Sequence, residues 1–428
     1  MPGKALASGF RSLSVRNFRL FAVGQLVSVA GTWMMVVAQD WLVLQLTRNS
    51  AAALATVTAL QFAPLMLFTL YAGGLADRHD KRRLLVWANT VSAALALALA
   101  FLDLTGAARL WHVYLFALAL GTVNAVEVPA RMSFVSELVG AELLPNASAL
   151  SAAYFNVARV AGPALAGLLI SASGTGWVML LNAVSYAGTV VGLRMMRTSE
   201  LHRSGRPAGR GSVVDGLRYV TARADLLLPV SLVAVIGLFG LNFQLLLPLL
   251  AKTVFHADAA SFGLLTTAFA AGSLLAALVG TGRRSRPPAR TVILCALAFG
   301  ALEAMAAGSP DFGSALALLA LTGFASLSFA QAANHRIQLG SDPEYRGRVM
   351  ALYTLILQGS TPLGALLVGW LAQQLGARAG LLAGGLVSVT AALLALVLER
   401  WGRAGAVELV SERRARPEHR TPTKGGTT

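Results

Sequence analysis

The sequence predicts an all-α integral membrane protein with twelve transmembrane helices arranged as two halves of six. Three observations support this prediction. The chain is 56% hydrophobic and only 13% charged, its apolar residues fall in runs of about 20 or more, which cross a bilayer as helices, and its basic residues cluster in alternate connections. Helices are required because lipid offers the backbone no water to bond, and the alternating pattern of barrel strands is absent.

The apolar runs place the spans in chain order. They cover residues 17–46, 51–77, 83–105, 110–134, 146–172, 176–197, 226–250, 259–281, 289–308, 313–336, 347–374 and 378–399. They form an N-terminal bundle (1–197) and a C-terminal bundle (226–400), joined by a cytoplasmic linker (198–225) in which an amphipathic helix is expected. The charged, Pro- and Gly-containing segment 401–428 is predicted to be a disordered cytoplasmic tail.

Charge in the connections predicts the orientation. Of the 35 Lys and Arg residues, the outer connections would hold only Arg48, Arg109, Lys252 and Arg378, and Arg159 alone lies within a span. Because cytoplasmic loops carry the excess of basic residues, both termini are predicted to be cytoplasmic. Membrane topology therefore explains the net charge of +16, and no nucleic-acid partner is expected.

The two halves echo each other weakly in sequence. Gly162-Pro163 in the fifth span and Thr361-Pro362 in the eleventh lie at corresponding places, and the basic turn at 78–83 has a counterpart at 283–290. Repeated halves of this kind are typical of secondary transporters, which alternate access about a central site.

The stretch GGLADRHDKRRLL at 73–85, between the second and third spans, resembles the signature loop of the major facilitator superfamily. The matching positions are Gly73, Leu75, Asp77, Arg78, Lys81, Arg82 and Leu85. Asp80 stands where that family usually has Gly.

Further stretches narrow the resemblance to the transmembrane secretion effector branch, which includes enterobactin-exporter-like proteins. They are AQDWLVLQLT at 38–47, VTALQFAP at 57–64, PARMSFVSELV at 129–139, NVARVAGPALAGLL at 156–169 and PEYRGRVMALY at 343–353. The resemblance implies the fold of that superfamily and a place in the bacterial plasma membrane.

The resemblance also implies a gate at 73–85. Asp77 is expected to face the start of the eleventh span, because the free N–H groups of a helix N-terminus favour an anion. Arg78 or Lys81 is expected to pair with Glu127 in the fourth span, and these contacts would break when the cytoplasmic side opens. Two alternatives remain open: the loop only anchors the topology, and Glu127 pairs with Arg131 along its own helix.

Three charged residues within spans are candidates for proton coupling or substrate binding: Asp40, Arg159 and Glu303. A charge at the centre of the hydrocarbon costs about 2.5–3.5 kcal/mol, so such residues usually face a cavity or a partner. Asp40 is either a proton-coupling carboxyl or an interfacial acid hydrogen-bonded by Trp41. Arg159 either binds an anionic substrate group or holds an acid such as Asp40 in register, and Glu303 is a weaker candidate of the same kind.

The segment around Gly162, Pro163 and Gly167 resembles the antiporter signature in the fifth span of superfamily exporters. Proline removes one backbone hydrogen bond and bends the helix, while the glycines let a neighbouring helix approach closely. Ordinary packing of small residues is the alternative.

These features predict a proton-coupled secondary exporter of a small, partly apolar molecule such as a drug, siderophore or secondary metabolite, acting as a monomer with no cofactor besides the proton gradient. An importer of the same fold and a non-transporting membrane protein remain alternatives. An enzyme is not expected, since the six histidines are scattered and no metal site is expected. The lone Cys295 excludes a disulfide within the chain. The sequence contains no GxxxxGK[ST] loop, so ATP binding is not expected.

Overall fold

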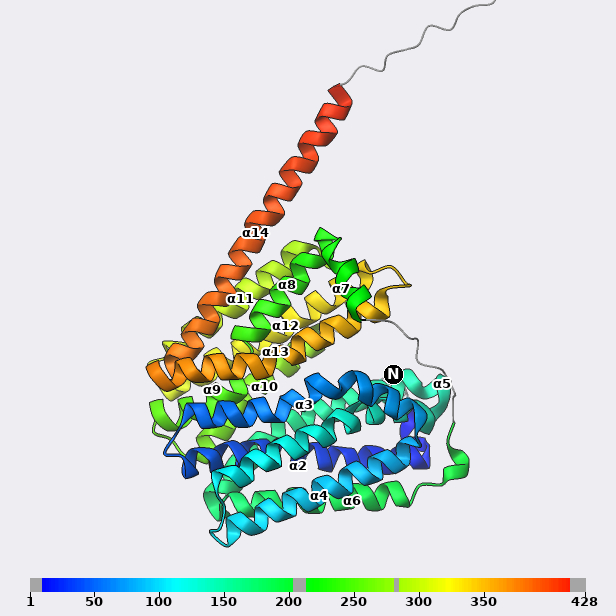
Figure 1. The fold of residues 1–428 in the computed structure, drawn as a ribbon, viewed down its shortest axis with the longest axis vertical. Coiled ribbons are helices and arrows are strands. Elements are labelled where there is room, and N and C mark those ends of the chain that lie inside the picture. Colours follow the sequence, from blue (N-terminus) through cyan, green and yellow to red (C-terminus); the bar gives the residue numbers. More distant parts are fainter. Residues whose placement is uncertain (1–9, 203–212, 281–284, 416–428) are drawn as a thin grey trace, which may run out of the picture.

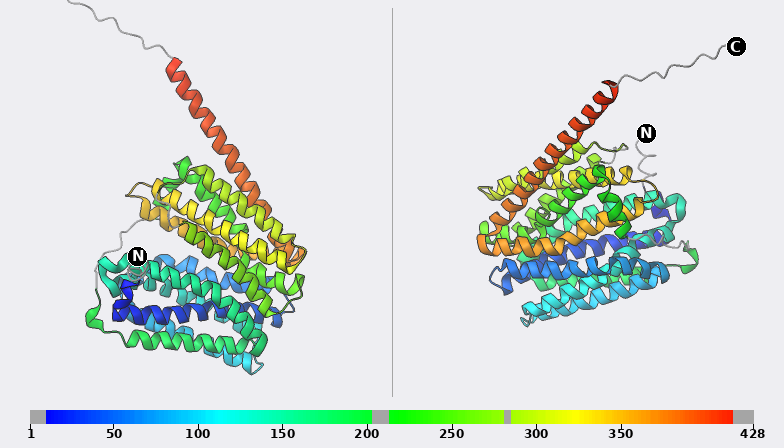
Figure 2. Two further views of the ribbon diagram at one scale, coloured as in Figure 1. Left: turned by 180° about the vertical axis from the view of Figure 1, so that it is seen from behind. Right: turned by 45° about the horizontal axis from the view of Figure 1, so that its top comes forward.

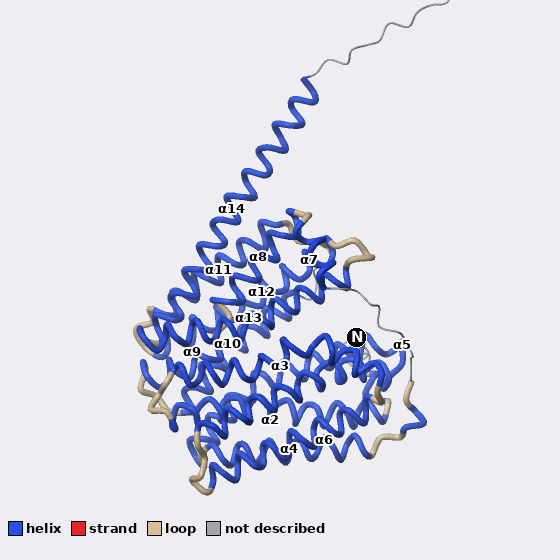
Figure 3. Tube along the Cα trace, in the orientation of Figure 1, coloured by secondary structure: helices blue, strands red, loops and turns tan. Residues whose placement is uncertain are grey.

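The computed structural model describes residues 10–202, 213–280 and 285–415, except for the side chains of residues 69–78, 213 and 401–415. Within this part of the chain the regular structure is helical (Figure 3). Eleven helical stretches among the described residues are long and apolar enough to cross a bilayer. One of them, α5 (Leu110–Ser173), bends at Gly140 and supplies two spans, which confirms the predicted all-α membrane fold with twelve spans.

The N-terminal half forms one bundle and the C-terminal half another (Figure 1). The N-terminal bundle contains α2 (Arg16–Leu46), α3 (Ala51–Arg78), α4 (Lys81–Leu104), α5 and α6 (Thr175–Arg194). The C-terminal bundle contains α8 (Ala224–Phe239), α9 (Phe243–Leu249), the π-helical turn η3 (Leu250–Val254), α10 (Ala259–Gly280), α11 (Ala289–Ala307), α12 (Phe312–Gly340), α13 (Arg346–Leu375) and α14 (Ala377–Ala415).

The same helix pairs form in both halves. The third and sixth spans, α4 and α6, pack side by side, as do their counterparts α11 and α14. The second and fourth spans touch where Gly121 of α5 meets the Gln61 backbone, and the corresponding α10 and α12 touch where Gly323 meets the Phe269 backbone. The weak sequence echo between the halves is therefore a structural repeat.

The halves contact each other through α5 with α10 and α3 with α13. Many of these contacts lie at the end of the molecule that contains Arg48: the Ser50 hydroxyl is 3.2 Å from the Gln373 side-chain oxygen, and the Ser171 hydroxyl is 3.4 Å from Asp258. Toward the opposite end the two bundles diverge, which Figures 1 and 2 show from several directions. The halves thus meet at the predicted outer end.

The seventh predicted span is not one continuous helix. It is interrupted after Phe239, resumes as α9 and continues as the π-helical turn. The Asn242 amide donates to the carbonyl oxygens of Leu238 and Phe239, at 2.9 and 3.2 Å, and so satisfies backbone groups at the break. Buried protein rather than lipid surrounds this irregular backbone, as a membrane interior requires.

The C-terminal boundary differs from the expectation. Helix α14 runs to Ala415, so the tail predicted to be disordered from residue 401 is helical over its first part, and residues 416–428 lie outside the described residues. No proline interrupts the chain between Ala377 and Pro417, and the backbone can therefore continue its hydrogen-bonding pattern beyond the bundle. Figure 1 shows this helix projecting from the C-terminal half.

The linker contains the expected short amphipathic helix, α7 (Val213–Thr221). It packs against α13, where Gly216 approaches the Arg348 carbonyl oxygen and Tyr219 stacks on Tyr345 with ring centroids 4.5 Å apart. Val220 is fully buried, whereas Leu217 is 48% exposed. The helix therefore belongs to the C-terminal half.

Helix contacts at glycine predict a measurable packing penalty. In Gly272→Ala, the added methyl group of α10 would overlap the Ala320 carbonyl oxygen, and overpacking costs about 1–3 kcal/mol. We expect a lower thermal unfolding temperature in detergent, followed by tryptophan fluorescence. Gly188→Ala is the matched control, because nothing lies within 4 Å of its added methyl group and Ala favours helix by up to about 1 kcal/mol. Equal destabilisation of both variants would contradict this account of the packing.

Candidate functional site

A cavity of about 350 Å³ lies between the two halves. Helices α2 and α5 of the N-terminal half and α9, α10, α12 and α13 of the C-terminal half all contribute to its wall. The wall is largely apolar and aromatic, and it carries two charged residues, Asp40 and Arg159. The structure thus brings together two of the three charged residues that the sequence singled out within spans.

Asp40 is fully buried on α2. Neither of its carboxyl oxygens has a hydrogen-bond partner among the described residues, so the alternative of an interfacial acid bonded by Trp41 is wrong. A buried polar group without a partner is costly. The described protein therefore offers this carboxyl no hydrogen bond to offset its burial.

Arg159 enters the same cavity from α5. Its guanidinium carbon lies 5.8 Å from the centroid of the Trp33 ring, a cation–π contact, and it has no ion-pair partner in the part of the chain that the structure describes. The alternative in which Arg159 holds Asp40 by a salt bridge is therefore not what the structure contains. The base remains available to a ligand.

Aromatic and charged groups close the cavity toward the predicted outer end. Trp41, next to Asp40, stacks on Phe262 of α10 with ring centroids 6.3 Å apart and an interplanar angle of 15°. The Lys252 ammonium of the π-helical turn lies 4.6 Å from the Trp41 ring centroid. Beyond them Asp258 accepts from the Ser261 backbone N–H, a hydrogen bond that holds the pKa of Asp258 below its usual range. The two contacts of Trp41 join α2 to the C-terminal half.

Glu303 lies elsewhere. It is fully buried on α11, and its carboxyl oxygens also lack hydrogen-bond partners among the described residues. Its neighbours are Gly240 at the end of α8 and Gly384 on α14, inside the C-terminal half, and it does not line the central cavity. The structure therefore separates it from Asp40 and Arg159.

Residues at the turn between α3 and α4 make their hydrogen bonds within the N-terminal half. Asp80, which departs from the family pattern, caps α4 by accepting from the Arg83 backbone N–H at 3.0 Å. Arg82 donates to the carbonyl oxygens of Leu193 and Arg194 at the end of α6, at 2.7 and 2.9 Å. A cation suits the C-terminal end of a helix, so these residues stabilise helix ends besides fixing topology.

Lys81 pairs with Glu137, and both side chains are almost fully buried. The expected partner of the loop bases, Glu127, lies three turns earlier on α5, about 15 Å along the helix axis and too deep for Lys81. Glu127 pairs instead with Arg131 at 3.0 Å, which confirms the alternative. Glu137 was the residue missed, although it belongs to the matched stretch at 129–139.

The remaining gate residues, Gly73, Asp77 and Arg78, lie on the last turns of α3. The side chains of Asp77 and Arg78 fall outside the described residues. Their predicted contacts with the start of α13 and with Glu127 therefore stay predictions.

A smaller polar chamber of about 150 Å³ lies within the N-terminal half. The Glu127–Arg131 ion pair lines it together with polar groups of α2, α4, α5 and α6, among them Asn124 and Tyr186. Trp33 lines both this chamber and the central cavity. Its ring is therefore a wall between the two spaces.

The glycines of the antiporter-like segment sit at close helix contacts. A methyl group on Gly162 would lie 2.7 Å from the Trp33 Cβ on α2, and one on Gly167 would lie 2.6 Å from the Ala259 carbonyl oxygen on α10. The Pro163 backbone meets Gly263 of α10. The segment thus supports the Trp33 wall and forms part of the contact between the halves.

Known proteins share both the sequence and the fold. The family model described as transmembrane secretion effector matches residues 7–419. Similar relatives include the multidrug efflux pump Tap of Mycolicibacterium fortuitum, 28% identical over 89% of this chain and 95% of its own. The macrolide efflux protein A of Streptococcus pyogenes is 24% identical over 88% and 95%. The staphyloferrin A transporter of Staphylococcus aureus is 26% identical over 58% and 63%.

Two solved structures share the fold at low sequence identity. The nucleoside transporter NupG is 12% identical with a TM-score of 0.68, covering 89% of this chain and 98% of its own. A bacterial homologue of the lysosomal transporter Spinster is 14% identical with a TM-score of 0.69, covering 90% and 97%. With the family match over nearly the full length, these likenesses make the chain a multi-pass membrane transporter rather than an enzyme, and it belongs to the transmembrane secretion effector family of the major facilitator superfamily.

Proposed function

We propose that this protein is a proton-coupled exporter of small, partly apolar molecules that works by alternating access. The observation that carries the proposal is a cavity between two repeated halves that contains a fully buried carboxyl, Asp40, without a hydrogen-bond partner in the described chain. Carboxyls in such positions serve as proton sites in membrane transporters. The proton gradient would be the energy source, and no other cofactor is needed.

In this proposal a proton and a substrate compete for Asp40. Either one compensates the buried carboxylate. The substrate-bound and the proton-bound protein would each favour a different conformation, and each conformation opens the cavity to a different side of the membrane. Substrate binds from the cytoplasm, a proton entering from outside displaces it, and the transporter returns with the proton. The apolar and aromatic wall favours a partly apolar substrate.

The arrangement of the halves supports a form open toward the cytoplasm. Contacts between α5 and α10 and around Trp41 close the outer end, while the bundles diverge toward the other (Figure 2). In the outward-open form the outer contacts would separate, and Asp77 would latch onto the start of α13. Helices α3 and α13 run antiparallel, because Ser50 meets Gln373 and Met66 lies near Gly359, so closure of the cytoplasmic end would bring the last turn of α3 toward the start of α13.

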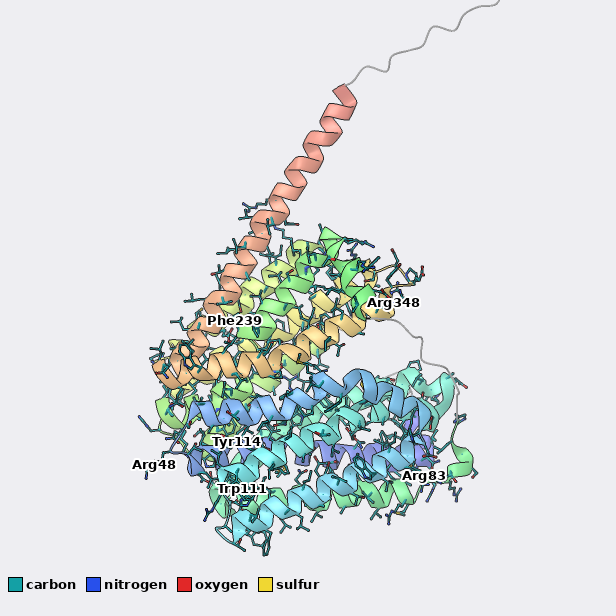
Figure 4. The ribbon with its side chains drawn as sticks, in the orientation of Figure 1. Arg48, Arg83, Trp111, Tyr114, Phe239 and Arg348 are labelled. Atoms are coloured by element: carbon teal, nitrogen blue, oxygen red, sulfur yellow. The ribbon has the colours of Figure 1, made fainter. Side chains whose placement is uncertain are left out.

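The proposed orientation places both termini in the cytoplasm of a bacterial cell. Figure 4 shows Arg48 at one end of the molecule and Arg83 and Arg348 at the other, as the positive-inside rule expects for an outer and two inner connections. One chain provides the whole cavity, so a monomer is sufficient. Export is favoured over import because relatives are named as efflux proteins.

Asp40→Asn is expected to abolish coupling. In proteoliposomes with an imposed pH gradient, the ratio of substrate flux with and without the gradient should fall to about one, because no titrating group remains in the cavity. Glu303→Gln is the matched control: it removes an equally buried carboxyl outside the cavity, and its flux should still respond. An Asp40→Asn protein that keeps the full response would refute the assignment of Asp40.

A cross-link at the outer end is expected to arrest transport. Ser50→Cys with Gln373→Cys, made in a Cys295→Ala background, joins two positions whose side chains touch across the halves. Cross-linking by a short bifunctional thiol reagent with a reducible bridge should stop flux, and reduction should restore it, because the outer contacts must open in each cycle. The uncross-linked double variant and each single variant are controls, and undiminished flux after complete cross-linking would exclude the alternating mechanism.

A further inference from the structure

The central cavity contains one acid and one base that do not pair with each other. Asp40 accepts no hydrogen bond from the described residues, and the Arg159 guanidinium lies over the face of Trp33 without an ion-pair partner in the described chain. In a buried site an uncompensated charge is costly. A ligand that fills this cavity must therefore compensate two opposite charges at two separate places.

The two charges lie along the same wall. Trp33, which Arg159 covers, and Asp40 both belong to α2 and line the cavity. Residues two turns apart share a helix face, and two turns correspond to about 10 Å. Arg159, which lies over Trp33, is therefore separated from Asp40 along this wall, and a ligand that satisfies both groups carries its opposite charges at separate ends.

The wall that surrounds the two charges is largely apolar and aromatic. Phe243 and Phe269 stack with ring centroids 4.3 Å apart, and Phe262 and Leu247 extend the same surface. Aromatic faces of this kind favour planar apolar bodies. A volume of about 350 Å³ is at the lower end of the range for cavities that hold drug-sized ligands.

Gln244 adds a third requirement. Its side-chain nitrogen is buried without a hydrogen-bond partner among the described residues, and the residue lines the cavity from α9. Because an amide nitrogen is a donor only, it calls for an acceptor on the ligand. Leaving it unpaired in a complex would cost binding free energy.

We infer that the cavity selects zwitterionic molecules with a flat apolar body, placing a cationic amine at Asp40 and an anionic group at Arg159. This inference rests on the proposed export function and adds the substrate class. A purely cationic ligand leaves Arg159 uncompensated, and a purely anionic ligand leaves Asp40 uncompensated. Only the zwitterion satisfies both, and its amine competes with the coupling proton for the same carboxylate.

Three probes that share one aromatic body test the inference. Ciprofloxacin carries an ammonium and a carboxylate at opposite ends, its methyl ester keeps only the cation, and its N-acetyl derivative keeps only the anion. Binding to the full chain in lipid nanodiscs is followed by probe fluorescence, and flux is measured separately in proteoliposomes. We expect ciprofloxacin to bind at least about tenfold more tightly than either analogue, which corresponds to one charge-assisted contact.

Variants assign each end of the probe. Arg159→Gln should remove the preference for ciprofloxacin over its methyl ester, whereas Arg159→Lys, which keeps the charge, should retain most of it. Asp40→Asn should remove the preference over the N-acetyl derivative, and Glu303→Gln, the matched buried carboxyl outside the cavity, should leave both preferences unchanged. Size-exclusion profiles establish that each variant is folded.

The outcomes separate this inference from the proposed function. Selective binding without flux supports the zwitterion site and refutes export. Flux with equal binding of all three probes supports export and overturns the zwitterion site. Failure of ciprofloxacin to bind, or a preference that survives in both Arg159→Gln and Asp40→Asn, would also overturn the inference.

Discussion

Backbone-to-backbone contact between the two halves is the constraint on which the other features depend. Gly167 and Gly263 let α5 and α10 approach until each meets the other's main chain. This approach draws the halves together at the predicted outer end, brings Phe262 onto Trp41, and leaves Asp40 and Arg159 on the wall of the space below. A larger side chain at either glycine would separate the halves where the cavity is closed, so its shape depends on residues that a ligand does not touch.

Much of the fold could be predicted because membrane helices are encoded locally. Apolar length and the distribution of basic residues gave twelve spans, and the helices begin and end close to the expected residues. The interrupted seventh span was not predictable in the same way, because Gly240 and Asn242 also occur inside continuous helices. The break is stabilised by the Asn242 amide, which donates to the carbonyl oxygens of Leu238 and Phe239 that the interruption leaves without helical partners. The extension of α14 was missed because a charged composition suggests disorder even where no proline stops a helix.

In the candidate site, too, some features were predictable from the sequence and others were not. The sequence identified Asp40 and Arg159 because a charge inside a span needs a reason, and both line the cavity. It could not say whether they pair with each other, since that depends on how α2 and α5 are rotated. For the same reason it gave Lys81 the wrong acid: Glu127 and Glu137 are both on α5, only Glu137 lies in a matched stretch, and the height of α5 relative to the loop selects Glu137. Spacing along one helix is readable from sequence, whereas register between helices is not.

Trp33 is shared by two compartments of unlike character, the central cavity and the polar chamber that contains the Glu127–Arg131 pair. Phe155 meets the edge of its ring at 6.3 Å, and Arg159 covers its face, so the indole is held from two directions. A partition of this kind divides a fixed total space. A displacement of the indole toward the polar chamber would therefore enlarge the central cavity at the expense of the space around the ion pair.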